Sequence, residues 1–231
     1  MKLAVVCCTF ARPHLLPEAI ESFLRQDYPA ELREMIVLDD AGQYATQAGD
    51  GWRIVSIARR FRTLGEKRNA AAALASPDAD AYVVWDDDDI YLPHALSAHA
   101  VALRTAAWSL PGEVYVERCD GTLRRRGSKG MFHSAWAYTR AAFELVGGYP
   151  FQQSGQDRGL AQRFRAAEVA AVDPLSDGTE PYLIYRWQTT ACWHLSALDR
   201  ATGYEQLAGC VSSGRRNHWI RPGWRRDYTK G

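Results

Sequence analysis

The sequence of 231 residues has no uninterrupted apolar run of about 18 residues, the length that a membrane-spanning helix needs. Its apolar start, Leu3 to Cys8, is too short for the core of a signal peptide and has no small-residue cleavage site behind it. The five cysteines form no CxxC pair and no His/Cys zinc spacing, so neither a disulfide framework nor a structural zinc is predicted. We expect a soluble, cytoplasmic protein with reduced thiols and no transmembrane segment.

The sequence also lacks an excess of one charge, because 28 Lys and Arg residues stand against 27 Asp and Glu residues. The distribution is uneven, since the segment from Arg200 to the end carries seven basic residues and only two acids. With 47% apolar residues the chain can bury a full core, and its length suits one domain. We therefore expect a single domain over residues 1–231, with a first half (1–110), a second half (111–200) and a basic tail (201–231).

The first half of the chain alternates apolar runs with an amphipathic segment. Leu3 to Cys8 is apolar on both faces, as is typical of a strand in the middle of a parallel sheet. Leu15 to Gln26 has apolar residues at helical spacing, and Met35 to Leu38 and Arg53 to Ile57 are further apolar runs. The order strand, helix, strand predicts a βαβ unit and an α/β fold, with a mostly parallel central sheet flanked by helices.

Candidate ligand-contacting residues follow two of these runs, at Thr9-Phe10 and Asp39-Asp40, and Asp86 to Asp89 follow a further apolar run, Tyr82 to Trp85. Ligands of open α/β sheets bind beyond the carboxyl ends of the strands, so these segments should converge on one crevice. Four adjacent carboxylates repel one another, and a hard divalent cation such as Mg²⁺ or Mn²⁺ would neutralise them. The alternatives are a solvated acidic turn that caps the helix near Pro93, and an Asx-type turn at Asp39-Asp40.

Two further stretches carry candidate functional groups. Lys67 and Arg68 lie in the first turn of an alanine-rich helix, where an anion such as phosphate would explain two cations; the alternative is that both reach solvent, which we expect for Lys67. Asp157 shares a helix face with Leu160 and Phe164, so it points toward an interior wall and could serve as a base. The alternative for Asp157 is an ordinary partner of the helix dipole.

Basic residues gather in two segments that can face a substrate or partner. Arg124 to Lys129 reads as a glycine-punctuated basic loop, for which a plain solvated surface is the alternative. Basic and aromatic residues alternate near the end of the chain: Arg215, Arg216, Trp219, Arg221, Trp224, Arg225 and Arg226. Basic groups interleaved with stacking aromatics are typical of nucleic-acid binding, and a polybasic tail can equally dock on anionic lipid.

The order of these motifs resembles that of the GT-A glycosyltransferases, most closely the family 2 enzymes, which invert the sugar and use nucleotide-sugar donors. The likeness runs from about Leu3 to Ser196. Five segments carry it, in the family's order: Thr9-Phe10-Ala11-Arg12-Pro13, Asp39-Asp40-Ala41, Gly65-Glu66-Lys67-Arg68-Asn69-Ala70-Ala71, the DxD motif Asp86-Asp87-Asp88, and the Glu-Asp catalytic pair at Gln156-Asp157. Gln156 replaces the usual Glu, and Ala41 lies where Gly is commoner.

The resemblance implies a nucleotide-sugar-binding first half, with a UDP-sugar as the expected donor. Thr9, Phe10 and Asp40 would hold the base, with Phe10 against its ring and Asp40 accepting a hydrogen bond from a ring N–H. Arg12, in the same turn as Phe10, would be a further substrate-binding residue. Arg68 would contact the ribose, the diphosphate or the donor sugar.

The resemblance also implies a metal site and a catalytic base. Asp88 and His194 would bind Mn²⁺ or Mg²⁺, while Asp86 and Asp87 would contact the donor. By its neighbours alone, His194 reads as a buried core histidine. Asp157 would take the proton of an acceptor hydroxyl, and Gln156 would contact substrate in an acceptor and catalytic second half.

Two other functions remain open at this stage. The acceptor can be a polyanion, either a lipid-linked glycan or nucleic acid, because similar small phage transferases glycosylate hydroxymethylated DNA bases. Alternatively, the chain can be a catalytically weak nucleotide-sugar-binding module, which the Gln at position 156 supports.

Overall fold

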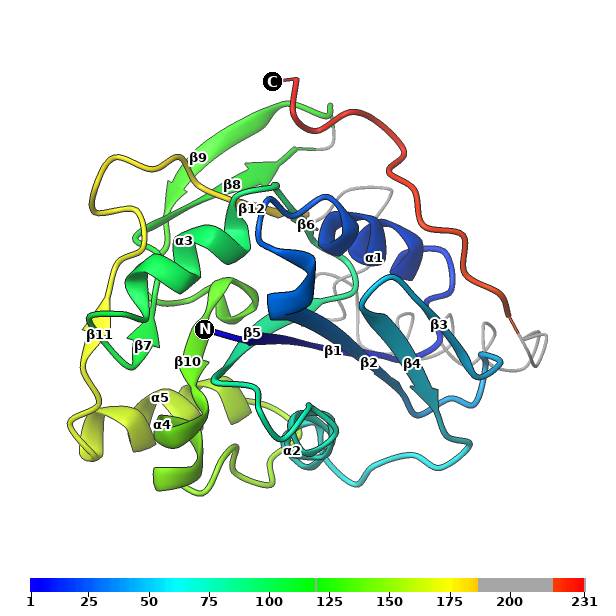
Figure 1. The fold of residues 1–231 in the computed structure, drawn as a ribbon, viewed down its shortest axis with the longest axis horizontal. Coiled ribbons are helices and arrows are strands. Elements are labelled where there is room, and N and C mark those ends of the chain that lie inside the picture. Colours follow the sequence, from blue (N-terminus) through cyan, green and yellow to red (C-terminus); the bar gives the residue numbers. More distant parts are fainter. Residues whose placement is uncertain (119, 187–217, 231) are drawn as a thin grey trace.

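The structure, a computed structural model, describes residues 1–118, 120–186 and 218–230 (Figure 1). Its centre is an eight-stranded sheet with the strand order β11-β7-β10-β5-β1-β2-β4-β3. The middle strands run parallel, and they are β1 (Leu3–Thr9), β2 (Arg33–Asp39), β4 (Trp52–Ser56) and β5 (Ala81–Asp86). The predicted α/β fold with a central sheet is confirmed.

The edges of this sheet are mixed. The antiparallel strand β10 (Ala137–Thr139) joins β5 to β7 (Trp108–Ser109), and β3 (Gln47–Gly49) is antiparallel to β4. Strand β11 (Ala171–Val172) pairs in parallel with β7. Strands from the second half of the chain therefore extend the sheet that the first half begins.

A second, four-stranded sheet has the order β6-β12-β8-β9. Its strands are β6 (Ile90–Tyr91), β12 (Leu183–Tyr185), β8 (Glu113–Glu117) and β9 (Leu123–Gly127). The predicted basic loop at Arg124 to Lys129 is wrong over most of its length, because β9 pairs antiparallel with β8, with Glu113 opposite Gly127. The exposed arginines of β9 hid the pairing, since strand patterns are recognised by their apolar side.

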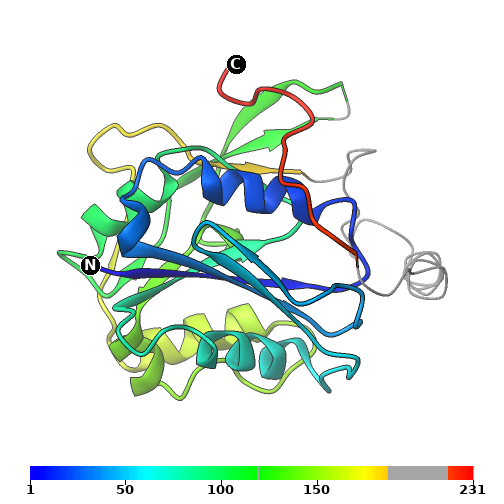
Figure 2. The same cartoon turned by 45° about the vertical axis from the view of Figure 1, so that its right-hand side comes forward.

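Helices cover both faces of the large sheet (Figure 2). Helices α1 (Leu16–Leu24) and α3 (Ala95–Ala102) pack on one face, and α2 (Leu64–Ala73), α4 (Arg140–Leu145) and α5 (Gln156–Ala166) pack on the other. Short 3₁₀ helices occur at Ala30–Leu32 and His133–Ala135. Of the helices in the described ranges, none combines the length and the apolar character that a bilayer span requires.

The two cores explain why β1 is apolar on both faces. Leu3 and Val5 pack with the side chains of α1 and α3, whereas Ala4 and Val6 pack with those of α2, α4 and α5. Alternate residues of a strand point to opposite faces, so a strand covered on both sides must be apolar throughout.

The described end of the chain, residues 218–230, returns across α1 (Figure 1). The indole Nε1 of Trp224 donates to Ser22 Oγ at 2.9 Å, and the Arg225 guanidinium lies 3.2 Å from Glu18. Arg226 pairs with Glu117 of β8 at 2.6 Å. We call residues 218–230 the C-terminal strap.

The strap changes the interpretation of the basic tail. Arg225 and Arg226 neutralise acids of the same chain, and Trp224 packs on α1, so these three side chains do not form an open polyanion-binding surface. Trp219 remains exposed, while Arg215 and Arg216 lie outside the described residues.

Candidate functional site

Three strand ends meet where the strand order of the large sheet reverses. Strand β1 lies between β2 and β5, and its last residue, Thr9, pairs with Asp39 at the end of β2. On its other side, Cys8 pairs with Asp86 at the end of β5. Such a reversal opens a crevice at the carboxyl edge, and the crevice is the usual ligand site of this kind of sheet.

The acid cluster Asp86 to Asp89 follows β5 at this edge. Asp87, Asp88 and Asp89 are 3%, 2% and 0% exposed, so the alternative of a solvated acidic turn is wrong. Carboxylate oxygens of Asp86, Asp88 and Asp89 lie within 4.8 Å of one another. Three oxygen ligands at this spacing suit a hard divalent cation.

Burial alters the protonation of this cluster. Removal from water raises the pKa of Asp89 well above its ordinary value, and the charges of Asp88 and Asp86 raise it further. The pKa of Asp87 is also raised, chiefly by burial, although the guanidinium of Arg12 opposes the shift. A cation that binds this cluster would therefore have to displace protons from its carboxyl groups.

Three side chains predicted as substrate contacts reach the acid cluster. Arg12 Nη1 donates to Asp87 Oδ1 at 2.9 Å and to Asp88 Oδ2 at 2.8 Å. Thr9 Oγ1 donates to Asp87 Oδ2 at 2.6 Å, and Arg68 Nη2 donates to Asp86 Oδ1 at 3.0 Å. The structure thus brings Thr9, Arg12 and Arg68 together with the DxD motif.

Asp39 and Asp40 have different surroundings. Asp39 is fully buried and accepts hydrogen bonds from the backbone N–H groups of Ala41 and Gln43 and from Ser56 Oγ, so it closes an Asx-type turn. The glycine of this turn lies one position later than the family pattern places it. Gly42 has a φ of +68°, and a Cβ there would come within 2.8 Å of Ala58 Cβ.

Asp40 directly follows β2 and has two basic partners. Lys67 Nζ donates to Asp40 Oδ1 and to the Thr9 carbonyl oxygen, both at 2.5 Å. The expectation that Lys67 reaches solvent is wrong, because this residue is only 4% exposed. Its buried ion pair with Asp40 ties α2 to the ends of β1 and β2.

Arg60 lies over the side chains predicted to hold the base, and sequence reasoning missed it. Its guanidinium carbon is 3.5 Å from the centroid of the Phe10 ring, and its Nη1 donates to Asp40 Oδ1 at 2.8 Å. Its position shortly after β4 could have indicated it. The loop that follows a parallel strand begins at the carboxyl edge of the sheet, where Phe10 and Asp40 also lie.

Arg186 contacts the backbone and one carboxylate of the acid cluster, and the sequence patterns did not indicate it. It is fully buried, with its backbone N–H donating to Asp89 Oδ1 at 3.1 Å and its Nε donating to the Asp88 carbonyl oxygen at 2.5 Å. Its Nη1 donates to Glu18 Oε2 of α1 at 2.7 Å. Arg186 therefore fixes the backbone that carries two of the clustered carboxylates.

The segment before α5 is joined to the start of α2. Gly65 N–H donates to the Gln152 carbonyl oxygen at 3.1 Å, and Asn69 exchanges two hydrogen bonds with the backbone of Tyr149. A Cβ at Gly65 would lie 1.9 Å from the Pro150 carbonyl oxygen, so only glycine fits this contact. The start of α5 is thereby held next to the start of α2.

Substituting Gly65 with alanine is expected to separate these two helix starts. Backbone on both sides must move, and we expect a loss of about 2 to 4 kcal/mol in unfolding free energy, in the range for overpacking and lost hydrogen bonds. Urea unfolding would measure this loss. Gly127→Ala is a suitable control, since nothing lies within 4 Å of a Cβ there; equal stability of the two variants would contradict the prediction.

Asp157 and Gln156 begin α5. Asp157 is half-buried in the first turn and forms no hydrogen bond or ion pair with any residue in the described ranges. Gln156 is 7% exposed, and its Oε1 has no hydrogen-bond partner among the described residues. The metal ligand predicted at His194 lies outside the described residues.

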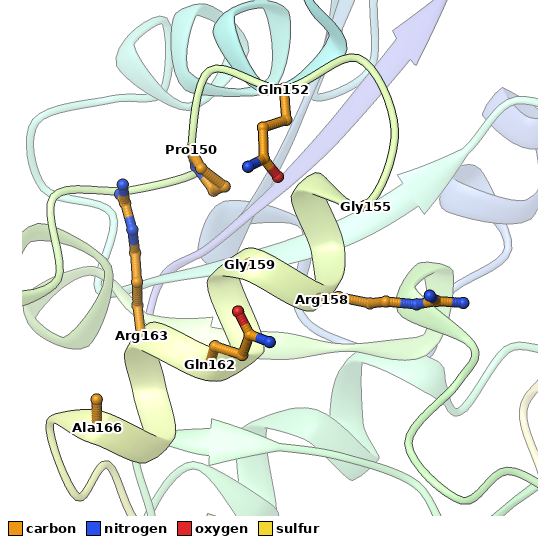
Figure 3. A pocket seen from close by; sticks show the side chains of 8 residues that line it. All are labelled: Pro150, Gln152, Gly155, Arg158, Gly159, Gln162, Arg163 and Ala166. Atoms are coloured by element: carbon orange, nitrogen blue, oxygen red, sulfur yellow. The ribbon is translucent and has the colours of Figure 1, made fainter.

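A pocket of about 550 Å³ lies on the outer side of α5 (Figure 3). Arg158, Gly159, Gln162 and Arg163 line it, and they occupy the helix face opposite the buried Leu160 and Phe164. Arg163 also donates to the Gly148 carbonyl oxygen at 2.8 Å. None of the residues that line this pocket belongs to the acid cluster or to the ends of β1, β2 and β5.

A sequence model of a protein family, described as glycosyl transferase family 2, matches residues 4–155, which is more than half of the chain. This range contains the acid cluster and its partners Thr9, Arg12 and Arg68, whereas Arg186 lies beyond it. No curated protein sequence matches the chain.

Solved structures with a similar fold include two proteins in complex with a nucleotide sugar. S. aureus TarS 1-349 in complex with UDP-GlcNAc is 14% identical, with a TM-score of 0.64 over 93% of this chain and 66% of that one. The mannosyltransferase PcManGT from Pyrobaculum calidifontis, in complex with GDP-Man and Mn²⁺, is 17% identical, with a TM-score of 0.60 over 96% of this chain and 66% of that one. At these identities the likeness shows the fold alone.

The chain spans somewhat less than two thirds of TarS 1-349, and 39% of the longer S. aureus TarS chain.

Proposed function

Because the chain belongs to glycosyl transferase family 2, we propose that it transfers a sugar from a nucleoside diphosphate to an acceptor hydroxyl, with inversion and with a divalent metal. The observation that carries this proposal is the convergence of Thr9, Arg12 and Arg68 on the acid cluster at the strand-order reversal. Carboxylates for a cation lie there beside basic groups that suit a diphosphate.

The donor is proposed to be a UDP-sugar. Structures of similar fold were solved with UDP-GlcNAc, UDP or GDP-Man, which supports nucleotide-sugar donors as a class. A carboxylate such as that of Asp40 can accept from the ring N–H of uracil or guanine, which neutral adenine and cytosine lack. Phe10 offers a ring face on which a base can stack.

The residues present fit a divalent cation. Asp86 and Asp88 have the DxD spacing, Asp89 adds a third carboxylate within 4.8 Å, and all three offer the oxygen ligands that Mn²⁺ and Mg²⁺ accept. The ion would stabilise the negative charge that develops on the leaving diphosphate. Arg12 and Arg68 would orient the same phosphates, and His194 remains a predicted fourth ligand.

Asp157 is proposed as the catalytic base. Its carboxylate would take the proton of the acceptor hydroxyl as the acceptor oxygen attacks C1 of the sugar. The bond between C1 and the diphosphate oxygen breaks on the opposite side, so one displacement inverts the anomeric centre. Gln156 is buried beside it, its Oε1 has no hydrogen-bond partner within the described ranges, and this oxygen would accept a hydrogen bond from a sugar or acceptor hydroxyl.

The acceptor stays a prediction. Among the described basic groups, Arg225 and Arg226 pair with acids, and Arg125 of β9 pairs with Glu180. Arg124 and Arg126 of β9, together with Lys129 and with Arg221 of the strap, remain exposed and still support a polyanionic acceptor. Label transfer to hydroxymethylated duplex DNA, compared with transfer to lipid-linked glycans, would separate the two classes.

The donor and metal proposals are tested together by thermal unfolding. UDP at about 100 times its Kd, with Mn²⁺, should raise the melting temperature by roughly 5 to 10 °C, because the ligand binds only the folded chain. Asp88→Asn should lose most of this shift, whereas Asp50→Asn, at an exposed site, should keep it. A chain that UDP, GDP and their sugars leave unshifted would contradict the proposal.

A further inference from the structure

The side chain of Arg60 makes the two contacts that are expected of a nucleotide base. Its flat guanidinium lies 3.5 Å from the centroid of the Phe10 ring, and its Nη1 donates to Asp40 Oδ1 at 2.8 Å. A base in this position would likewise stack on Phe10 and donate a ring N–H to Asp40. The guanidinium and the base therefore compete for one place.

Asp40 has few free hydrogen-bond acceptor positions while Arg60 is paired with it. Its Oδ1 accepts from both Arg60 and Lys67, and its Oδ2 accepts from the backbone N–H of Phe61 at 3.1 Å. A carboxylate has about four acceptor positions in all, two on each oxygen. A ring N–H can therefore bind at Oδ1 only when one of the two cations leaves.

Burial decides which of the two cations can leave. The Lys67 side chain is 4% exposed and also donates to the Thr9 carbonyl oxygen, so moving it would bury unpaired groups. The Arg60 side chain is 50% exposed. Arg60 can turn into solvent by giving up only its ion pair with Asp40 and its contact with the Phe10 ring.

We propose that Arg60 is an internal substitute for the nucleobase, which fills the base subsite of the free protein and leaves it when the donor enters. This inference rests on the proposed function, because it takes Phe10 and Asp40 as the base subsite. The apparent affinity for the donor is then lower than the intrinsic affinity, by the fraction of molecules in which Arg60 is displaced.

Calorimetric titration of UDP and GDP in the presence of Mn²⁺ tests this competition. Arg60→Ala should bind the preferred nucleotide about five- to tenfold more tightly than the unchanged chain, since a partly exposed ion pair and a cation–π contact no longer have to be broken. Arg60→Lys keeps the charge but not the flat group, so its affinity should be intermediate. Arg59→Ala removes a neighbouring exposed arginine and should change the affinity less than twofold.

A nuclear magnetic resonance measurement checks the position of Arg60 without any nucleotide. The side-chain signals of Arg60, identified by their loss in Arg60→Lys, should show an upfield ring-current shift in the free protein. Phe10→Leu should abolish the shift, and added nucleotide should reduce it. Unshifted Arg60 signals in the free protein would overturn the inference.

The titrations also separate the inference from the proposed function. If the unchanged chain binds UDP or GDP and Arg60→Ala binds equally or more weakly, Arg60 is no competitor of the base and the donor proposal still stands. If no variant binds either nucleotide while all melt at the temperature of the unchanged chain, the proposed function fails and the inference fails with it.

Discussion

Replacing Asp157 with asparagine is expected to lower the rate of sugar transfer by about 100- to 10,000-fold, the usual contribution of general base catalysis. Asparagine has the same shape but cannot take the proton of the acceptor hydroxyl. Asp157 is suited to this role because it is half-buried at the start of α5 and pairs with no residue in the described ranges. Its carboxylate is therefore available to an incoming hydroxyl.

The measurement is the initial rate of transfer together with the Kd of the nucleotide. A base that acts only on the acceptor leaves nucleotide binding within about twofold while the rate falls. Glu144→Gln, an exposed acid of α4, serves as the matched control. Full transfer by Asp157→Asn would exclude Asp157 as the base, and an equal loss of nucleotide binding would make it a donor contact instead.

Substituting Glu18 with alanine is expected to lower the free energy of unfolding by about 3 to 5 kcal/mol, the range for breaking a buried ion pair on one side. Glu18 is 2% exposed and accepts from the fully buried Arg186 at 2.7 Å. It also accepts the backbone N–H of Arg225 at 3.0 Å. The substitution removes an acidic partner, at 2.7 Å, of a guanidinium that has no access to water.

Urea unfolding would compare this variant with Glu21→Ala on the same helix. Glu21 pairs with Arg25 near the surface, and such pairs contribute about 0.2 to 1 kcal/mol. Because Arg186 also donates to the Asp88 carbonyl oxygen, the milder Glu18→Gln should weaken Mn²⁺ binding even where the fold survives. If Glu18→Ala unfolds at the same urea concentration as Glu21→Ala, the buried pair does not stabilise the fold.

The main elements of the fold could be predicted because their signals are local. The apolar runs of β1 and β2 and the helical spacing of α1 are periodic over a few residues, and the structure confirms them within one or two residues at most ends. Strand β9 was missed because its side chains are mostly basic. Strands β7 and β11 have two residues each, too few to show any period.

The convergence of Thr9, Asp40 and the acid cluster could be predicted from strand ends alone, since parallel strands bring their carboxyl ends to one edge. The partners of these groups could not. Lys67 contacts Asp40 across 27 residues of sequence, and Arg186 contacts Glu18 across 168. Patterns within a few residues of sequence cannot predict such pairings. Cationic side chains are expected at the surface, so a buried Lys67 runs against the usual distribution.

The C-terminal strap has a consequence for how the chain matures. Trp224 and Arg225 meet α1 across 202 and 207 residues, so these contacts close a very long stretch of chain. A folding intermediate can form the central sheet before they close, and this side of the helix is then still uncovered. Docking of the strap is therefore a late folding step, and a chain stalled before it would present an unfinished surface to chaperones.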